Sequence, residues 1–577
     1  MDNSFAAPHP SSVLPTPAHI RVDEGTVVVP LMVTVAGAPE ALEAMRPFLR
    51  GLEDCGAVKR VRSVGPDAAD SDKGYASDHA TAAFLRVSLD DRGCEPCGDD
   101  SVADDPPDGE RGIPKSPVQA LGCACYDLRV TAEGIEVSGT LGGLRAAAQT
   151  LLSLLPPACL MPGSAQGSGA QALLRRCQIQ DRPRHVWRGV MIDTVRHFMP
   201  IGWLRQLVRI AAFHKLNVVR LHLTDDQGWR VPIEAFPRLT TVSSRRRETV
   251  GMPYPTEEHD GIPHGGFYTK DELRALVAYA AQFGITVVPE IDLPGHMVAA
   301  IAAYPQWGNT DQSNSETPLE VRTTWGVSED IINTRPETLA ALKTILDEVM
   351  EIFPSAFIHI GGDEAPTRDW ENSEEVAALM EREGIATVRE VQGWIMDDLV
   401  DYLQEQGRTV IAWDEAMDAG IDTDVVIQAW RDPDKVEVAL ASGYRTIASP
   451  QQHFYLDYQH SLDPAEPPGI GGWRGQYLSM EKLYAYDPPE GILGIEAPLW
   501  TEFVKTPQRA SFQLLPRLAG VAEKAWCGSR VPEGEFMEAL QTQEMRYCAL
   551  GWDHRPLSGP GIRWSADFED KTEGSDL

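Results

Sequence analysis

Eight short apolar segments in residues 190–499 limit the fold more than any other feature of this sequence. In most cases a polar cluster follows the segment, and then a stretch with helical apolar spacing. Strand-then-helix repetition is typical of a parallel sheet, and eight such units in about 340 residues predict a closed (β/α)8 barrel. The expected strands are Val190–Ile192, Val218–Leu223, Thr286–Ile291, Phe357–Ile360, Val410–Trp413, Val425–Ala429, Arg445–Ala448 and Leu493–Leu499.

Three of the intervening stretches are good examples of the expected barrel helices. Leu339–Phe353, Val388–Gln406 and Pro507–Trp526 have helical length and apolar residues on one face. Because helices between parallel strands cover the outside of the sheet, each should bury its apolar face against the barrel.

A smaller α+β domain is expected before the barrel. Tyr126–Val130 and Gly134–Ser138 alternate apolar and polar residues as strands do, and Leu144–Leu155 has the spacing of a covering helix. The expected fold is therefore α/β, a (β/α)8 TIM barrel preceded by a smaller α+β domain. The expected boundaries are residues 1–25 for a flexible N-terminus, 26–180 for the α+β domain, 181–553 for the barrel and 554–577 for a polar C-terminal tail.

Residues 90–110 differ in composition from the rest of the α+β domain. They contain nine acidic residues with Gly and Pro and almost no apolar side chains, so we expect a solvated insertion there. Cys94 and Cys97 have the spacing of a zinc-binding pair, but without a second such pair the sequence does not predict a metal site. Nine cysteines, an odd number, favour free thiols in a reducing compartment over a disulfide framework.

The net charge of −34 limits the partners of the chain. Nucleic acids and anionic membranes are not expected, because binding to either needs a surplus of Lys and Arg. The sequence has no basic and apolar leader at its start and no apolar stretch of about 18 residues, the length of a membrane span. We therefore expect a cytoplasmic location and a neutral substrate. We expect no cofactor, and the chain could form a homo-oligomer.

The residues that follow the expected strands form the candidate site, because barrel enzymes build their active sites at the carboxyl ends of the strands. An Asp after one strand is often only a helix cap, and a Trp is more often core than ligand platform. Here, however, such residues follow all eight strands. They are Asp193 and Arg196, Asp225 and Asp226, Glu290, Asp292 and His296, Asp363 and Glu364, Trp413, Trp430, Tyr455 and Asp457, and Trp500 and Glu502.

Aromatic faces together with carboxylates suit a sugar, whose C–H groups stack on rings while its hydroxyls need directional hydrogen bonds. Glycoside hydrolysis usually needs two carboxyl groups that flank the scissile bond. Asp363 and Glu364 are adjacent, and successive side chains at a strand end diverge, so they are poorly placed to occupy opposite faces of one sugar. The pair instead favours a substrate that supplies its own nucleophile, such as a 2-acetamido oxygen.

Several separate motifs between Tyr126 and Trp526 point to one known family. They are Asp181-Arg-Pro-Arg184, Arg188-Gly-Val-Met-Ile-Asp-Thr-Val-Arg-His-Phe198, Lys215-Leu-Asn217, His222-Leu-Thr-Asp-Asp-Gln-Gly-Trp229, Pro289-Glu-Ile-Asp-Leu-Pro-Gly-His296, His359-Ile-Gly-Gly-Asp-Glu364 and Leu499-Trp-Thr-Glu502. In these motifs the chain resembles glycoside hydrolase family 20, the β-N-acetylhexosaminidases. The resemblance implies an exo-acting, retaining enzyme that removes terminal β-linked N-acetylglucosamine from an oligosaccharide or glycoconjugate through an oxazolinium intermediate. It leaves N-acetylgalactosamine open as a second substrate.

The resemblance implies catalytic roles for the matching residues. Glu364 resembles the general acid that protonates the leaving oxygen and later activates water. Asp363 resembles the residue that accepts from the acetamido N–H and stabilises the oxazolinium intermediate. Asp225 and His296 resemble a relay that contacts the acid and would keep the pKa of Glu364 high, and Asp292 would support this relay.

The resemblance also implies a pocket that holds one sugar. Arg196 resembles the arginine that binds the 3- and 4-hydroxyls, whereas Asp457 and Glu502 accept from the 4- and 6-hydroxyls. Tyr455 resembles the donor to the acetamido oxygen. Three tryptophans resemble an aromatic box around the sugar: Trp413, Trp430 and Trp500. A pocket closed in this way admits a single terminal residue, which implies exo action.

One position departs from the family, and three alternatives remain open. The family often has a second histidine two residues before His222, where this chain has Arg220. A lacto-N-biosidase-like enzyme would release a disaccharide and would need a pocket open beyond the first sugar. A carbohydrate-binding barrel would lack hydrolysis altogether. Metal-dependent hydrolysis would use Asp225, Asp226 and His296.

Overall fold

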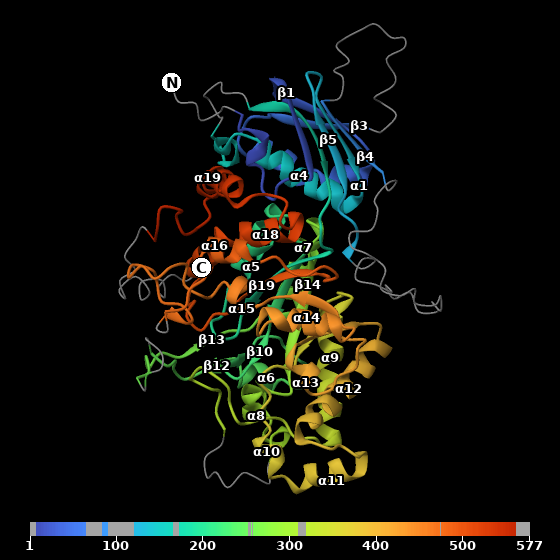
Figure 1. The fold of residues 1–577 in the computed structure, drawn as a ribbon, viewed down its shortest axis with the longest axis vertical. Helices are drawn as coiled ribbons and strands as arrows, with labels where there is room; N and C mark the ends of the chain where they lie inside the picture. Colours follow the sequence, from blue (N-terminus) through green and yellow to red (C-terminus); the bar gives the residue numbers. More distant parts are fainter. Residues whose placement is uncertain are drawn as a thin grey trace.

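The computed structural model describes residues 7–64, 84–90, 121–164, 172–251, 256, 258–309, 319–472 and 475–560. A seven-stranded sheet with its helices lies at one end of an elongated molecule, and a closed barrel of eight parallel strands forms the rest (Figure 1). This arrangement confirms the expected fold class.

The N-terminal sheet is built from strands that bury alternate side chains. In β5 (Tyr126–Val130), Tyr126, Leu128 and Val130 are buried and the residues between them are exposed, as expected for a sheet with one covered face. The helix α4 (Leu141–Leu154) covers this face and begins at Thr140, whose hydroxyl accepts from the Gly143 N–H. The strand order is β1 (His19–Val28), β7 (Leu173–Asp181), β5, β6 (Ile135–Gly139), β4 (Leu85–Leu89), β2 (Met32–Ala36) and β3 (Arg60–Val64).

The prediction of a flexible N-terminus over residues 1–25 is wrong for its described part. Residues 19–28 form β1, which pairs antiparallel with β7 at the edge of the sheet. Before it, the side chain of Leu14 is buried, and the carbonyl of Ser12 accepts a 2.7 Å hydrogen bond from Arg546 of the last helix, α19 (Glu533–Leu550). No local pattern in residues 1–25 predicts this order, because both partners lie far away along the chain.

The eight barrel strands coincide with the eight expected segments to within a few residues. They are β8 (Trp187–Asp193), β9 (Val218–His222), β14 (Thr286–Leu293), β15 (Phe357–Gly361), β16 (Thr409–Trp413), β17 (Val426–Ala429), β18 (Arg445–Ala448) and β19 (Gly494–Leu499). Strand β19 pairs with β8 in parallel and closes the barrel. Nearly every strand residue is buried, because helices cover the outside and side chains fill the interior.

Helices alternate with the strands as the sequence predicts, with one exception. The helices α9 (Pro336–Ile352) and α12 (Val388–Glu405) match the expected segments. The expected single helix Pro507–Trp526 is instead two helices, α17 (Pro507–Leu514) and α18 (Arg517–Cys527). Pro516 lies at the break, because proline has no N–H to donate within a helix and its ring clashes with the preceding turn.

The other helices of the two domains are shorter or lie between the elements already named. They are α1 (Pro39–Ala44), α2 (Arg46–Asp54), α5 (Ile201–Phe213), α6 (Arg238–Thr241), α7 (Lys270–Gln282), α8 (Val298–Ala303), α10 (Arg368–Glu371), α11 (Glu374–Glu383), α13 (Glu415–Asp418), α14 (Pro433–Ala441), α15 (Gln451–Phe454) and α16 (Met480–Ala485).

A buried ion pair joins the sheet domain to the barrel. Lys215, in the turn between α5 and β9, lies 2.9 Å from Asp181 at the end of β7, and both side chains are almost fully buried. Asp181 also accepts hydrogen bonds from the Tyr126 hydroxyl and from the indole N–H of Trp526. Two of the sequence motifs, those at Asp181 and Lys215, therefore belong to the domain junction.

The cysteine prediction is only partly correct. Cys55, Cys159, Cys177, Cys527 and Cys548 are free, but Cys123 and Cys125, just before β5, are each disulfide-bonded. Their own sulfur atoms lie 3.2 Å apart, too far for a bond to each other. An odd total leaves room for bonded cysteines beside free ones, so the count alone could not exclude them. Residues 91–110, which include Cys94 and Cys97, lie outside the described residues, as do residues 561–577 of the expected tail.

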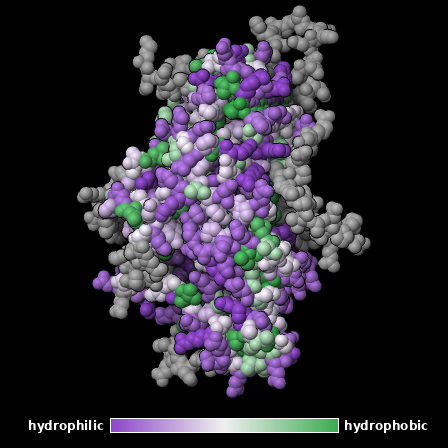
Figure 2. Space-filling model, in the orientation of Figure 1, coloured by the Kyte–Doolittle hydropathy of each residue, from purple (hydrophilic) through white to green (hydrophobic). Residues whose placement is uncertain are grey.

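The visible surface is mainly hydrophilic, with small scattered apolar patches (Figure 2), in keeping with the net charge of −34. Within the described part of the chain, no helix combines the length and the apolar character that crossing a bilayer requires.

Candidate active site

The predicted site residues come together at the carboxyl ends of the barrel strands. Arg196 follows β8, Asp225 lies in the short strand β10 (Thr224–Asp225) after β9, and Asp292 lies near the end of β14, with His296 just beyond it. The other predicted residues lie at or beyond the ends of β15 to β19: Asp363, Glu364, Trp413, Trp430, Tyr455, Asp457, Trp500 and Glu502. Most are buried, whereas the Glu364 side chain is 38% exposed.

The two glycines before Asp363 are required by the backbone of this turn. Gly361 has φ of 69°, and a Cβ there would lie 1.6 Å from Asp292 Oδ1. The Gly362 carbonyl accepts a 2.7 Å hydrogen bond from the side chain of Gln392 in α12. The next residue but one, Glu364, itself has φ of 46°, a conformation that non-glycine residues adopt at a cost and that is common at functional sites. The turn therefore presents the two carboxylates in a fixed direction.

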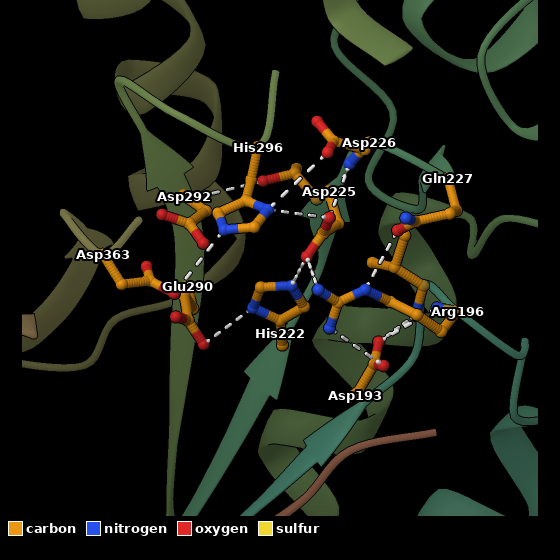
Figure 3. Close-up of polar contacts among 12 residues, drawn as sticks. Asp193, Arg196, His222, Asp225, Asp226, Gln227, Glu290, Asp292, His296 and Asp363 are labelled. Carbon is orange, nitrogen blue, oxygen red and sulfur yellow. Dashed lines mark hydrogen bonds and ion pairs between the residues drawn. The ribbon is translucent and has the colours of Figure 1, made fainter. Parts of the chain in front are cut away.

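His296 stands between the acidic residues of the site (Figure 3). Its Nε2 lies 3.6 Å from Asp363 Oδ2 and 3.5 Å from Glu364 Oε2, while its Nδ1 lies 3.2 Å from Asp225 Oδ1. Burial opposes a charge on the ring, but the adjacent carboxylates outweigh burial and raise the pKa of His296 well above its usual value. The histidine is therefore an imidazolium at neutral pH.

Asp225 connects this histidine to two further cations. Its Oδ2 accepts from His222 Nε2 at 2.8 Å and lies 2.8 Å from Arg196 Nη2. Burial raises the pKa of Asp225, but Arg196, His296 and the hydrogen bond from His222 outweigh it and hold that pKa well below the usual range. Asp225 is therefore an ionised acceptor that orients His296.

The pKa values of the two central carboxylates are shifted in opposite directions. Burial, with the charge of Glu364 beside it, raises the pKa of Asp363 to about 6. Burial also acts on Glu364, but the hydrogen bond and charge of His296 dominate and lower the pKa of Glu364. The expectation that the neighbours keep the pKa of Glu364 high is therefore wrong for this structure, because His296 carries the proton in its place.

Asp292 supports the turn from below. Its Oδ1 accepts a 3.3 Å hydrogen bond from the Gly362 N–H, and its pKa is raised by burial and by the charge of Asp363. A protonated Asp292 can donate to a neighbouring oxygen, so this residue fits a supporting position.

Arg196 and two carboxylates form the other side of the site. The guanidinium lies 4.0 Å from Glu502 Oε1, and its centre lies 4.9 Å from the Trp500 ring. Its Nε donates to Gln227 Oε1 over 2.9 Å. Burial, followed by the charge of Glu502, raises the pKa of Asp457 well above its usual value. These groups supply donors and acceptors suited to sugar hydroxyls.

Four aromatic residues form a continuous wall. Trp430 and Tyr455 are nearly parallel, with ring centroids 5.9 Å apart. The Trp500 ring lies 6.3 Å from that of Tyr455 and 6.1 Å from that of Trp413. Burial raises the pKa of Tyr455 well above its usual value, so its hydroxyl keeps its proton and remains a donor.

The structure adds site residues that the sequence analysis did not assign. His222 bridges Asp225 and Glu290, and it could have been found because it opens one of the quoted motifs. Glu415 accepts a 2.8 Å hydrogen bond from the Trp430 indole, and burial raises its pKa to about 8. Arg322 lies 3.2 Å from Asp226 Oδ2. It comes from a loop far from any strand end, so its position gave no signal in the sequence.

Three groups in the described part of the chain have the composition and spacing to hold a metal ion. In each group the possible ligand atoms lie within 4.8 Å of one another. The groups are His222, Glu290 and Asp292; Asp225, Asp226 and His296; and Asp292, His296 and Asp363. The ion pairs already described occupy many of these oxygens and nitrogens, so the same geometry also serves an acid–base site without metal.

Comparisons with known proteins agree with this geometry. The model of the glycosyl hydrolase family 20 catalytic domain matches residues 185–529, more than half of the chain. A beta-hexosaminidase of Vibrio furnissii is 36% identical over 403 residues, which are 67% of this chain and 62% of that protein. A beta-hexosaminidase of Porphyromonas gingivalis is 33% identical over 419 residues, which are 70% of this chain and 50% of that protein. The chain thus spans less than two thirds of the length of either relative.

A solved structure shows the same architecture over nearly the whole chain. The exo beta-N-acetylglucosaminidase of Vibrio harveyi, in complex with N-acetylglucosamine, superposes with a TM-score of 0.77 at 27% identity, covering 95% of this chain and 79% of that one. The family match spans the barrel and every predicted site residue. This chain therefore belongs to glycosyl hydrolase family 20.

Proposed function

We propose that this protein is an exo-acting, retaining β-N-acetylhexosaminidase that removes terminal β-linked N-acetylglucosamine by substrate-assisted catalysis. The observation that carries the proposal is the common position of Asp363 and Glu364, which both lie about 3.5 Å from the same His296 nitrogen. Two carboxylates on the same side of a sugar can serve as an acid and a group that orients the amide. They are poorly placed to serve as an acid and a nucleophile on opposite faces of the sugar. The 2-acetamido oxygen of the substrate then attacks the anomeric carbon.

Glu364 is the proton donor in this proposal, and His296 supplies its proton. The raised pKa of His296 and the lowered pKa of Glu364 assign the resting proton to His296, and the Glu364 side chain is 38% exposed. A sugar bound over Glu364 removes water from the carboxylate, which raises its pKa and draws the proton across the 3.5 Å contact. Protonated Glu364 then protonates the leaving oxygen, and the resulting carboxylate later takes a proton from the attacking water.

Asp363 and Tyr455 hold the acetamido group. Above pH 6, the value to which its pKa is raised, Asp363 is ionised. It can then accept from the acetamido N–H and stabilise the positive charge of the oxazolinium intermediate. The Tyr455 hydroxyl donates to the acetamido oxygen. Together they hold the oxygen near the anomeric carbon, which lowers the entropic cost of attack.

The residues that would close the pocket around one terminal sugar support exo action. Arg196, Asp457 and Glu502 would bind the hydroxyls of the terminal sugar, and Trp413, Trp430 and Trp500 would stack around its ring. The Vibrio harveyi relative is named an exo enzyme and was solved with N-acetylglucosamine, which supports the same assignment here.

Two matched substitutions test the assignment of roles. Glu364→Gln removes the proton donor, so it should lose most activity on substrates with poor leaving groups and less on aryl glycosides whose leaving group needs no proton. Asp363→Asn keeps the proton donor and should lose activity on both. Equal behaviour of the two variants on both substrate types would contradict the separate roles.

Two alternatives have distinct outcomes. The groups of His, Asp and Glu around His296 favour metal-dependent hydrolysis as the second candidate; loss of activity with a chelator, restored by a divalent metal, would support it. A lacto-N-biosidase-like enzyme would release a disaccharide from a tetrasaccharide, which chromatography of the products distinguishes from a monosaccharide.

A further inference from the structure

Below the active site, the barrel interior contains a layer of charged side chains. Side chains two residues apart on a strand point to the same side, so the interior is arranged in layers. The lowest layer is apolar and includes Val218, Val288, Phe357, Ile411 and Val426. The next layer lies two residues further along each strand and contains Arg220, Glu290, His359, Trp413, Gln428 and Glu496.

Three members of this layer form a fully buried charged cluster. The Arg220 guanidinium donates to Glu290 through Nη1, and to Glu496 Oε1 through Nε over 2.7 Å. All three side chains have zero exposure. Burying ions costs several kcal/mol each unless they are paired and hydrogen-bonded. Barrels usually fill such a layer with apolar residues. A buried charged cluster in this position therefore indicates a functional role.

Glu290 is the centre of the cluster, and it contacts both parts of the active site. One oxygen, Oε2, binds Arg220 and lies 3.0 Å from His222 Nδ1. The other, Oε1, accepts a 3.1 Å hydrogen bond from the indole N–H of Trp413. The Trp413 ring also lies 4.6 Å from the Arg220 guanidinium. The cluster thus touches the aromatic wall and the histidine that holds Asp225.

We propose that the Arg220–Glu290–Glu496 cluster positions the active site, holding His222 and Trp413 so that Asp225 and the aromatic wall keep their orientation. These three are positioning residues, because they act on the substrate only through the side chains that they contact, His222 and Trp413. The proposal rests on the proposed role of Glu364 as proton donor, since the contacts run from Glu290 through His222, Asp225 and His296 to Glu364.

The charge balance of the cluster assigns a proton to His222. One arginine and two glutamates leave one negative charge, which an imidazolium at His222 neutralises. Burial opposes that charge, but Glu290 and the hydrogen bond from His222 to Asp225 outweigh it and raise the pKa of His222 to about 10. His222 then donates from Nε2 to Asp225, while its Nδ1 forms a 3.0 Å ion pair with Glu290 Oε2. The ionisable groups around it are Glu290, Asp225, Arg220, His359, Asp292 and Asp363.

Glu290→Gln tests the positioning role, because it keeps the shape of the side chain and an oxygen for the Trp413 indole while it removes the charge beside His222. The pKa of His222 should fall, so the alkaline limb of the kcat/KM profile should move to lower pH by about one unit or more. KM at pH 6 should change little, since the aromatic wall keeps its hydrogen bond. A merely structural role would lower activity equally at every pH.

Arg220 provides a second, independent series. Arg220→Met leaves two carboxylates without their cation and removes the group beneath Trp413, so kcat/KM should fall by more than about tenfold. Arg220→Lys restores the charge and should recover part of that loss. Arg546→Met is the matched control: this buried arginine bonds the Ser12 and Ser153 carbonyls at the domain junction, and its loss should lower stability without moving the pH profile.

Two results would overturn the proposal. One is a folded Glu290→Gln enzyme whose alkaline limb coincides with that of the wild type. The other is failure of both Glu290→Gln and Arg220→Lys to fold, because the cluster would then serve the barrel rather than the site. Glu364→Gln separates this proposal from the proposed function: if that variant keeps full activity, the role of Glu364 fails, whereas an unmoved limb in Glu290→Gln rejects the positioning role alone.

Discussion

At the scale of single residues, the site stores a proton on His296 rather than on Glu364. The imidazolium is held by Asp225 on one side and by Asp363 and Glu364 on the other. Sequence reasoning could name all four residues, because each follows a strand. It placed the proton on Glu364, because the distances that decide its position depend on how three strand ends meet in space.

The buried charge of Asp363 should lower the stability of the protein. Its pKa rises from 3.8 to about 6 on folding, so folding disfavours the ionised form of this carboxyl. The free energy of unfolding therefore decreases as pH rises from 3.8 to about 6. Asp363→Asn should therefore be inactive but more stable at pH 7, by roughly 1–3 kcal/mol, with no gain at pH 3.5. Thermal unfolding at both pH values measures this; a variant less stable than wild type at pH 7 would contradict it.

The same residue sets an acidic limit on activity. Because protonated Asp363 cannot accept from the acetamido N–H, kcat/KM should decline as pH falls below about 6. A pH profile with an aryl N-acetylglucosaminide measures the decline. Full activity down to pH 4 would show that ionised Asp363 is not required.

At the scale of elements, the turn after β15 determines where the two carboxylates lie. Asp363 and Glu364 follow two glycines with φ of 69° and 99°, conformations that favour glycine. The end of a strand is a local feature of the sequence, which is why the position of Asp363 and Glu364 after this strand could be predicted. The break at Pro516 was missed, although proline there is also a local signal, because the apolar spacing continues through it.

Gly361→Ala should disrupt the turn by more than the strain of placing an alanine at a positive φ. The new Cβ would lie 1.6 Å from Asp292 Oδ1, which displaces Asp292 and the turn, so kcat/KM should fall about 10²-fold. Gly384→Ala is the matched control, since Gly384 has φ of 71° at the end of α11 and its Cβ would meet nothing within 4 Å. That variant should lose only about 1 kcal/mol of stability and keep its activity. Equal activity of the two variants would contradict this account.

At the scale of the whole molecule, the barrel and the sheet domain are joined through buried charges. The strand-and-helix repetition predicted the barrel, since each unit is local. The junction could not be predicted, because Asp181, Lys215 and Trp526 lie far apart in the sequence and meet only in the folded chain. The order of residues 7–25 depends on the same long-range packing.

Lys215→Met should destabilise the junction without changing the chemistry. It leaves Asp181 buried without its cation, which should cost roughly 3–5 kcal/mol. Lys343→Met is the control, because its pair with Asp398 has a similar 2.8 Å distance but is about one third exposed, and such pairs contribute less than about 1 kcal/mol. Thermal unfolding measures the stability of both variants. An equal loss of stability in the two would show that the buried pair at the junction contributes no more than an exposed pair.

In the proposed mechanism the substrate's own acetamido group is the nucleophile. It is tested most directly by comparing hydrolysis of an aryl β-N-acetylglucosaminide with that of the aryl β-glucoside, which has a 2-hydroxyl in place of the acetamido group. We expect kcat/KM for the N-acetyl substrate to be greater by on the order of 10³-fold or more. Hydrolysis of the two substrates at similar rates would contradict it.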